Sequence, residues 1–111
     1  MGETRTVKLR FTPDALADID SVLSGIADTS PSGALSVRTR LDAVLDRLLE
    51  QPRSGTRTNS PPLRRILVTP YPYWLFYQIA EGAIIVIALR HAARDPRSMP
   101  DAGPDWRSGE S

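Results

Sequence analysis

Residues 64–96, RRILVTPYPYWLFYQIAEGAIIVIALRHAARDP, decide the fold of this 111-residue chain. The stretch contains three strand-like runs: Arg64–Thr69, the aromatic run Tyr73–Ile79 and the almost wholly apolar run Ala83–Leu89. Glu81-Gly82 is a tight-turn signal, so the second and third runs should form an antiparallel hairpin. The third run has no polar alternation, which predicts a central strand that is covered on both faces.

The chain before this stretch has a helical pattern. Thr12-Pro13 and Ser30-Pro31 each combine an N-cap residue with a proline at the first helical position. Apolar residues then recur at spacings of three and four, which predicts two helices with one apolar face each. These residues are Leu16, Ile19, Leu23 and Ile26 in the first helix and Val37, Leu41, Val44, Leu45, Leu48 and Leu49 in the second.

Two further segments complete the expected fold. Val7–Phe11 alternates apolar and polar residues and predicts a strand, whereas Arg53–Pro62 has turn residues without apolar periodicity and predicts a loop. The order is then β-α-α-β-β-β, which indicates an α+β fold. We expect two antiparallel helices packed on one face of a twisted, mainly antiparallel four-stranded sheet. Residues 1–97 should form this single domain, and the polar, Pro-rich residues 98–111 should be a disordered tail.

The aromatic run has two apolar faces. By parity, Tyr73, Leu75, Tyr77 and Ile79 point to one side, and Trp74, Phe76 and Gln78 point to the other. Two helices can cover only one of these faces. The other should therefore be covered by a partner or by loops of the chain itself.

The composition excludes several kinds of site. The chain has no cysteine and one histidine, so it has no thiolate nucleophile and cannot form a disulfide or a histidine-rich metal site. The first residues, MGETRTVKLRF, lack the apolar core of a secretory signal, and no apolar run approaches the ~20 residues that cross a bilayer. We therefore expect a cytoplasmic protein with no metal, no cofactor and no membrane association.

The net charge of +1 conceals an uneven distribution. Residues 1–51 carry six Arg or Lys against eight Asp or Glu, and residues 98–111 carry one Arg against three acids. Residues 52–97 carry seven arginines against two acids, Glu81 and Asp95. This excess lies in and around the predicted strands, and it favours an anionic partner.

The element order, the run PYPYWLFYQI at 70–79 and the ending RHAARDP at 90–96 together resemble the ParE/RelE superfamily of bacterial toxins. The resemblance covers roughly residues 5–97. Members are the toxin halves of type II toxin–antitoxin pairs, so the resemblance implies a growth inhibitor that a cognate antitoxin neutralises. A typical antitoxin tail would lay an amphipathic helix in an apolar groove and add a strand to a sheet edge.

The superfamily has two activities. RelE-like members cut mRNA on the ribosome, whereas ParE-like members inhibit DNA gyrase. The ending His91-Ala92-Ala93-Arg94-Asp95-Pro96 looks more like the ParE side, so DNA gyrase is the expected target. A RelE-like endoribonuclease acting on ribosomal mRNA and a non-toxic binding module of the same fold are the alternatives.

RNA cleavage by the 2′-hydroxyl needs a general acid, a general base and cations. Arg65, His91 and Arg94 would serve if the chain is a nuclease. Tyr77 or Glu81 would have to supply the second proton-transfer group, but nothing in the sequence places either beside His91, which weakens the catalytic hypothesis. The candidate binding residues are Arg64, Arg65, Tyr77, Arg90, His91 and Arg94.

Overall fold

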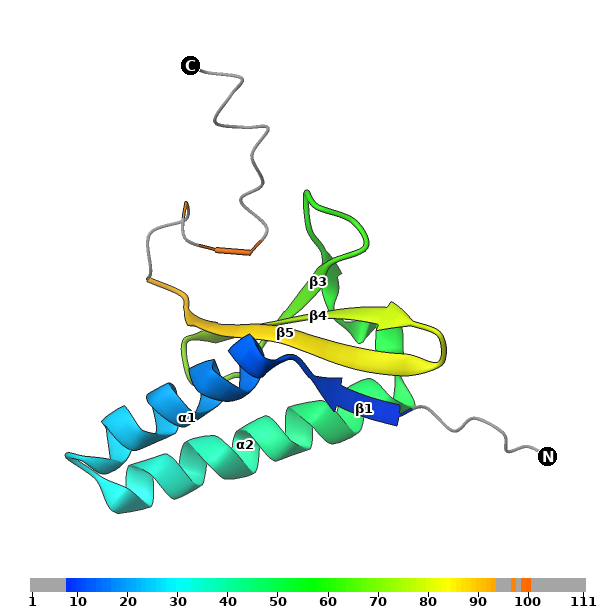
Figure 1. The fold of residues 1–111 in the computed structure, drawn as a ribbon. Coiled ribbons are helices and arrows are strands. Elements are labelled where there is room, and N and C mark those ends of the chain that lie inside the picture. The colour runs from blue at the N-terminus through cyan, green and yellow to red at the C-terminus, as the bar shows by residue number, and fades with distance from the viewer. Residues whose placement is uncertain (1–7, 94–96, 98, 101–111) are drawn as a thin grey trace.

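The computed structural model describes residues 8–93, 97, 99 and 100, and it has two layers (Figure 1). One layer is a pair of helices, α1 (Pro13–Ala27) and α2 (Pro31–Glu50). Within the described residues the other layer is a five-stranded sheet with the order β1-β5-β4-β3-β2. The strands are β1 (Lys8–Phe11), β2 (Thr56–Arg57), β3 (Arg64–Leu67), β4 (Tyr73–Ala80) and β5 (Ala83–His91). The predicted α+β class, with its helices on one face of the sheet, is confirmed.

The sheet has one strand more than the predicted four. The predicted loop Arg53–Pro62 instead begins within a 3₁₀ turn, η2 (Pro52–Ser54), and continues into β2, which pairs antiparallel with β3. β2 has two exposed residues and no apolar pattern, so its sequence carried no strand signal. Its strand geometry depends on backbone pairing with β3 rather than on burial.

Both helices begin where the sequence predicted. The hydroxyl of Thr12 accepts a hydrogen bond from the Ala15 N–H at 3.0 Å, and the Ser30 hydroxyl accepts one from the Gly33 N–H at 3.0 Å. Each cap satisfies a backbone donor that has no partner inside its helix. A proline follows each cap and presets the helical φ angle.

β5 is an interior strand, as predicted, and it lies between β1 and β4. It pairs antiparallel with β4 through a turn in which Glu81 and Gly82 have φ angles of 51° and 73°. Two positive φ angles are typical of the hairpin turn that fits the twist of the flanking strands. On its other side, β5 pairs in parallel with β1. The first and the last of the described strands therefore lie side by side, with β1 at the edge of the sheet.

The main core lies between the helices and one face of the sheet. It includes Leu75 and Tyr77 of β4, with Tyr73 and Ile79 packed against it, so the predicted helix-side face of this strand is confirmed. The buried residues of α2 are Val37, Leu41, Val44, Leu45 and Leu48. The first helix differs from the prediction, because Ala15 is its buried residue and Leu16 is 55% exposed.

A smaller core covers the opposite face of the sheet. Phe76 is 0% exposed there, in contact with a cluster that includes Leu63, Ala88 and Met99. Leu63 comes from the segment before β3, and Met99 comes from beyond β5. The chain's own segments therefore cover part of the second apolar face, one of the two possibilities that the sequence left open.

Candidate functional site

Two arginines and a tryptophan come together on the sheet face opposite the helices. Arg65 of β3 pairs with Phe76 of β4, and Trp74 of β4 pairs with Arg90 of β5. The Arg65 guanidinium carbon lies 4.1 Å from the centre of the Trp74 ring, which is cation–π geometry. We call Arg65, Trp74 and Arg90 the arginine–tryptophan cluster. The register of three strands thus unites two of the candidate binding residues.

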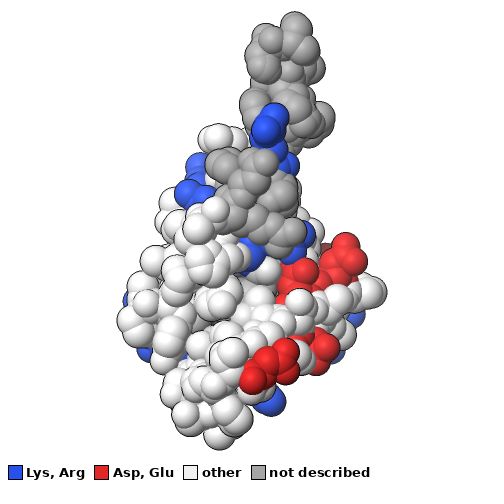
Figure 2. Space-filling view, turned by 90° about the vertical axis from the view of Figure 1, so that its left-hand side faces the viewer, with Lys and Arg blue, Asp and Glu red and all other residues white. Residues whose placement is uncertain are grey.

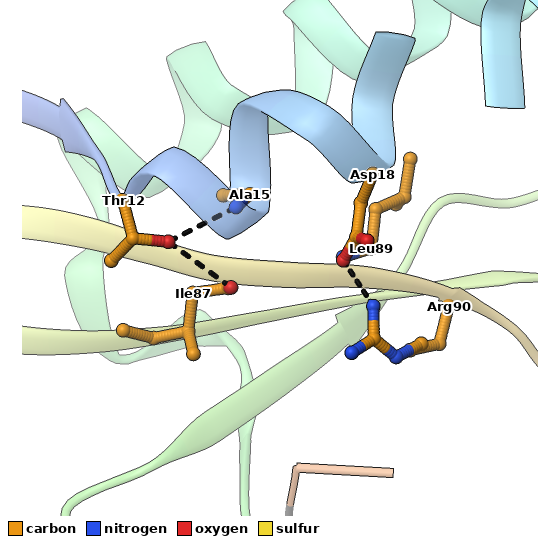
Figure 3. A network of polar contacts seen from close by, with 6 residues as sticks. All are labelled: Thr12, Ala15, Asp18, Ile87, Leu89 and Arg90. Carbon is orange, nitrogen blue, oxygen red and sulfur yellow. Dashed lines mark hydrogen bonds and ion pairs between the residues drawn. The ribbon is translucent and has the colours of Figure 1, made fainter. Parts of the chain in front are cut away.

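Helix α1 covers the edge of β5 beyond the end of β1 (Figure 3). Thr12 donates its hydroxyl proton to the Ile87 carbonyl at 3.3 Å while it caps the helix. Asp18, six residues further along the chain, accepts a hydrogen bond from the Leu89 N–H at 3.0 Å and forms an ion pair with Arg90. Arg90 is therefore tied to α1 as well as to the sheet.

His91 lies at the end of β5 and is exposed. Its Nδ1 accepts a hydrogen bond from the Ala93 N–H at 3.0 Å. Its ring meets the ring of Tyr73 edge-on, with 5.2 Å between the centroids. Because Tyr73 and His91 pair directly, next to the Trp74 and Arg90 pair, their side chains point to the opposite face of the sheet from the arginine–tryptophan cluster.

Tyr77 is fully buried, unlike the other candidate binding residues that the structure describes. Its hydroxyl donates to the Pro52 carbonyl at 2.7 Å and accepts from the Gly55 N–H at 2.9 Å. Burial raises the pKa of this hydroxyl above its ordinary value of 10.0, although the Gly55 N–H and the charge of Arg64 oppose the shift. In this conformation Tyr77 holds the segment after α2 against the sheet.

Arg64 supports the same segment from outside. Its Nη1 donates to the Gly55 carbonyl at 2.9 Å and lies 3.4 Å from the Arg53 carbonyl oxygen. Arg64 also lines a pocket together with Arg53 and Arg57, two residues that the sequence analysis did not single out. Both lie in the segment Arg53–Pro62 that the sequence predicted to be a loop. The remaining candidate, Arg94, lies outside the described residues.

An apolar groove lies between α1 and α2, beside β1. It has a volume of about 310 Å³, and its walls include Leu16 and Leu23 of α1, Leu41 and Leu45 of α2, and Phe11 of β1. Asp20, Arg38 and Asp42 add charge to its lining. The sequence analysis had assigned Leu16 to the apolar face of α1, but this leucine is exposed at the groove. We call this feature the helix groove.

Charge is separated along the surface. On the face that Figure 2 shows, acidic side chains gather in the lower part and basic side chains mainly in the upper part. Helix α1 contains three acidic residues, Asp14, Asp18 and Asp20. The arginines of residues 52–97 supply most of the basic excess. An elongated partner could thus meet surfaces of opposite sign on one molecule.

Other kinds of site receive no support from the described part of the chain. Among residues 8–93, 97, 99 and 100, no group of three or more His, Cys, Asp or Glu side chains is placed to hold a metal ion. Within the same residues, no helix is long and apolar enough to cross a membrane. The surfaces that stand out are therefore the arginine–tryptophan cluster, the arginine-lined pocket and the helix groove.

Comparison with known proteins assigns the chain to a family. The family model described as "ParE toxin of type II toxin-antitoxin system, parDE" matches residues 9–96. Toxin RelE2 of Caulobacter vibrioides is 38% identical over 84 residues, which cover 76% of this chain and 93% of that protein.

Solved structures show the same fold. A chain of the chromosomal ParDE system from P. aeruginosa has a TM-score of 0.69 at 16% identity, and the match covers 79% of this chain and 98% of that one. A chain of the intact E. coli RelBE toxin–antitoxin complex has a TM-score of 0.62 at 25% identity, with 80% and 100% covered. Together with the match over residues 9–96, these likenesses show that the chain belongs to the ParE toxin family of type II toxin–antitoxin systems, within the ParE/RelE superfamily.

Proposed function

We propose that this toxin inhibits growth by binding DNA gyrase in the cytoplasm. The observation that carries the proposal is the distribution of basic and proton-transferring groups over two faces of the sheet. Arg65 and Arg90 share one face with Trp74, whereas His91 shares the other with Tyr73. This arrangement favours a surface that binds a large partner over a pocket that performs chemistry.

RNA cleavage sets a stricter requirement. A general acid, a general base and stabilising cations must converge within hydrogen-bond reach of one phosphate. Arg90 is held by Asp18, and Tyr77 is buried with its hydroxyl already bonded to Pro52 and Gly55. Within the described residues, neither side chain lies where it could act on one phosphate together with His91. The proposal therefore assigns no catalytic role to the cluster.

The helix groove is the surface that we assign to the cognate antitoxin. The related E. coli structure is a toxin–antitoxin complex, and an amphipathic helix of a partner would fit a groove with leucine walls. Leu16 is 55% exposed at this groove, so the isolated toxin leaves a large apolar side chain in water. A helix seated there would bury it, which stabilises a complex by about 25 cal/mol per Å² of apolar area removed from water.

The decisive experiment compares the two targets directly. The purified full-length chain is added to a gyrase supercoiling assay, and in parallel to a translation system in which mRNA cleavage is mapped. We expect supercoiling to fall as the toxin concentration rises, and to recover when the antitoxin is added. Undiminished supercoiling at saturating toxin would exclude the gyrase proposal, and normal growth after induction without antitoxin would favour a non-toxic binding module.

One contact favours a second candidate function, a RelE-like endoribonuclease. Tyr73 touches His91, and a phenol beside an imidazole could supply the missing proton-transfer group. The relative named Toxin RelE2 gives this alternative further support. Under this alternative, His91→Ala abolishes transcript cutting in growing cells. Under the gyrase proposal, wild-type chain and His91→Ala both leave transcripts intact.

A further inference from the structure

A separate cationic pocket lies where β2 and β3 meet the end of β4. Its volume is about 370 Å³, and Arg53, Arg57 and Arg64 line it together with Pro61, Leu63 and Ile79. It shares no lining residue with the arginine–tryptophan cluster or the helix groove. No Asp or Glu is among its described lining residues. Three arginines therefore line one cavity without a carboxylate in its described wall.

Hydrogen bonds fix the walls of this pocket. Arg64 binds the carbonyl of Gly55, the residue that joins η2, which carries Arg53, to β2, which carries Arg57. The Thr58 hydroxyl and N–H both donate to the Leu63 carbonyl, at 2.9 and 3.2 Å. The loop from β2 to β3 is thus closed on itself. The cavity is part of the fold rather than a gap between loose side chains.

We propose that this pocket binds the phosphate group of a nucleotide, either free or within a nucleic acid strand. A guanidinium is a planar fork of N–H donors that matches the oxygen atoms of a phosphate, and it stays charged at any physiological pH. Arg53 and Arg57 are exposed, so they can reorient toward an arriving anion. Arg64 is half-buried and already anchored, and it supplies fixed charge at the wall.

The size and apolar wall of the pocket indicate more than a bare phosphate. Small-molecule sites in proteins are typically about 300–1,000 Å³, and this cavity of about 370 Å³ lies at the lower end of that range. Pro61, Leu63 and Ile79 offer an apolar wall beside the charges. A base can rest on such a surface or on the plane of an arginine while its phosphate pairs with the guanidinium groups.

The test uses the full-length chain and four probes: adenosine 5′-monophosphate, inorganic phosphate, adenosine and a six-nucleotide single strand of DNA. Binding is measured by calorimetry, and its location by NMR shifts of the Gly55 and Thr58 amides. We expect the nucleotide to bind at least tenfold more tightly than phosphate or adenosine. If the DNA strand binds tenfold more tightly than the mononucleotide, the phosphate that the pocket binds belongs to a nucleic acid. Equal affinities of the two probes indicate a free nucleotide.

Two double variants separate the pocket from general electrostatics. Arg53→Ala with Arg57→Ala removes two exposed charges at the pocket, and Arg38→Ala with Arg47→Ala removes two exposed charges on α2. The first pair should weaken nucleotide binding at least tenfold, and the second less than threefold. Circular dichroism spectra verify that both variants are folded.

Three results would overturn the proposal. Equal losses of nucleotide affinity in both double variants would show that net charge alone causes the weaker binding. Shifts confined to amides other than those around Gly55 and Thr58 would place the nucleotide elsewhere. Absence of binding by all three phosphate-containing probes would show that the pocket does not take a phosphate. The gyrase proposal is independent of all three, because the supercoiling assay measures it separately.

Discussion

Tyr77 shows how one buried side chain can hold several segments together. Its hydroxyl bonds to Pro52 and Gly55, while its ring lies in the main core. Gly55 is required beside it, because a Cβ atom there would lie 2.5 Å from the tyrosine oxygen and 2.8 Å from the Arg65 carbonyl oxygen. The residue was a binding candidate from the sequence, and that role remains a prediction. In the structure its hydroxyl positions the turn that leads to the arginine-lined pocket.

Replacing Tyr77 with phenylalanine should therefore destabilise the fold. The change leaves the buried Gly55 N–H and the Pro52 carbonyl without this partner, and we expect the free energy of unfolding to fall by about 1–3 kcal/mol. Urea denaturation measures the loss. Tyr73→Phe, on the same strand but only half-buried, is the control and should lose less than about 0.5 kcal/mol. Equal losses in the two variants would contradict the structural role of the Tyr77 hydroxyl.

Because of the same hydroxyl, we expect the free energy of unfolding to depend on pH in the alkaline range. Burial raises the folded-state pKa of Tyr77 above 10.0, so the folded protein holds this proton more tightly than the unfolded chain. The resulting stability is fully present below the unfolded pKa of 10.0 and is lost as pH rises toward and through the folded pKa. Unfolding free energies measured from about pH 8 to 11 should decline more steeply for wild type than for Tyr77→Phe. Parallel curves would refute this linkage.

At the level of elements, helix α1 has two tasks. It packs its buried side on α2 and the sheet, and it also supplies the polar groups that cover the β5 edge. Edge strands expose unpaired backbone groups, and Thr12 and Asp18 occupy two of those groups beyond the end of β1. The helix N-terminus is therefore part of the sheet's hydrogen-bond pattern.

Substitutions at the two helix caps can measure how much the contact between α1 and β5 adds to stability. Thr12→Ala removes both a cap and the bond to the Ile87 carbonyl, whereas Ser30→Ala removes a cap alone. We expect a loss of about 1 kcal/mol for Ser30→Ala and about 1.5–2.5 kcal/mol for Thr12→Ala. Thermal or urea unfolding of the two variants gives the comparison. A smaller loss for Thr12→Ala would show that the Ile87 bond contributes nothing.

The elements differ in how far the sequence could predict them. The caps, the hairpin and the two faces of β4 follow from neighbouring residues, so local patterns were sufficient. β2 could not be found, because its two exposed residues become a strand only through pairing with β3. The bond between Asp18 and Arg90 spans 72 residues, and Asp18 alone suggests only a favourable charge near a helix N-terminus. The arginine-lined pocket was missed for a similar reason, since it forms only when the predicted loop Arg53–Pro62 folds against β3 and β4.

On the scale of the whole molecule, the helix groove and the arginine-bearing surfaces lie on different parts of the fold. The groove lies on the helix layer, and the arginine–tryptophan cluster lies on the opposite face of the sheet. An antitoxin in the groove would therefore leave the cluster to be covered by another of its segments. This predicts an antitoxin long enough to reach from one layer to the other.

Leu16→Lys should weaken antitoxin binding at least tenfold while the toxin still folds. Leu16 is 55% exposed in the groove, so a lysine there harms the bound state more than the free one. Leu35→Lys is the matched control, because Leu35 is 68% exposed and does not line the groove. Calorimetry with the purified antitoxin measures both variants. Similar affinities for the two would place the antitoxin on another surface.

The parallel pairing of β1 with β5 has a consequence for synthesis of the toxin. β1 leaves the ribosome well before β5, its partner in the sheet, and the Thr12 bond to Ile87 spans 75 residues. The nascent chain therefore cannot close its core until β5 has emerged, because that strand contacts β1, β4 and α1. A toxin cut short before Ala83 lacks the strand that joins β1 to the rest of the sheet. Toxicity should thus arise only after β5 has been synthesised, and the cell can use the time before that point to supply the antitoxin.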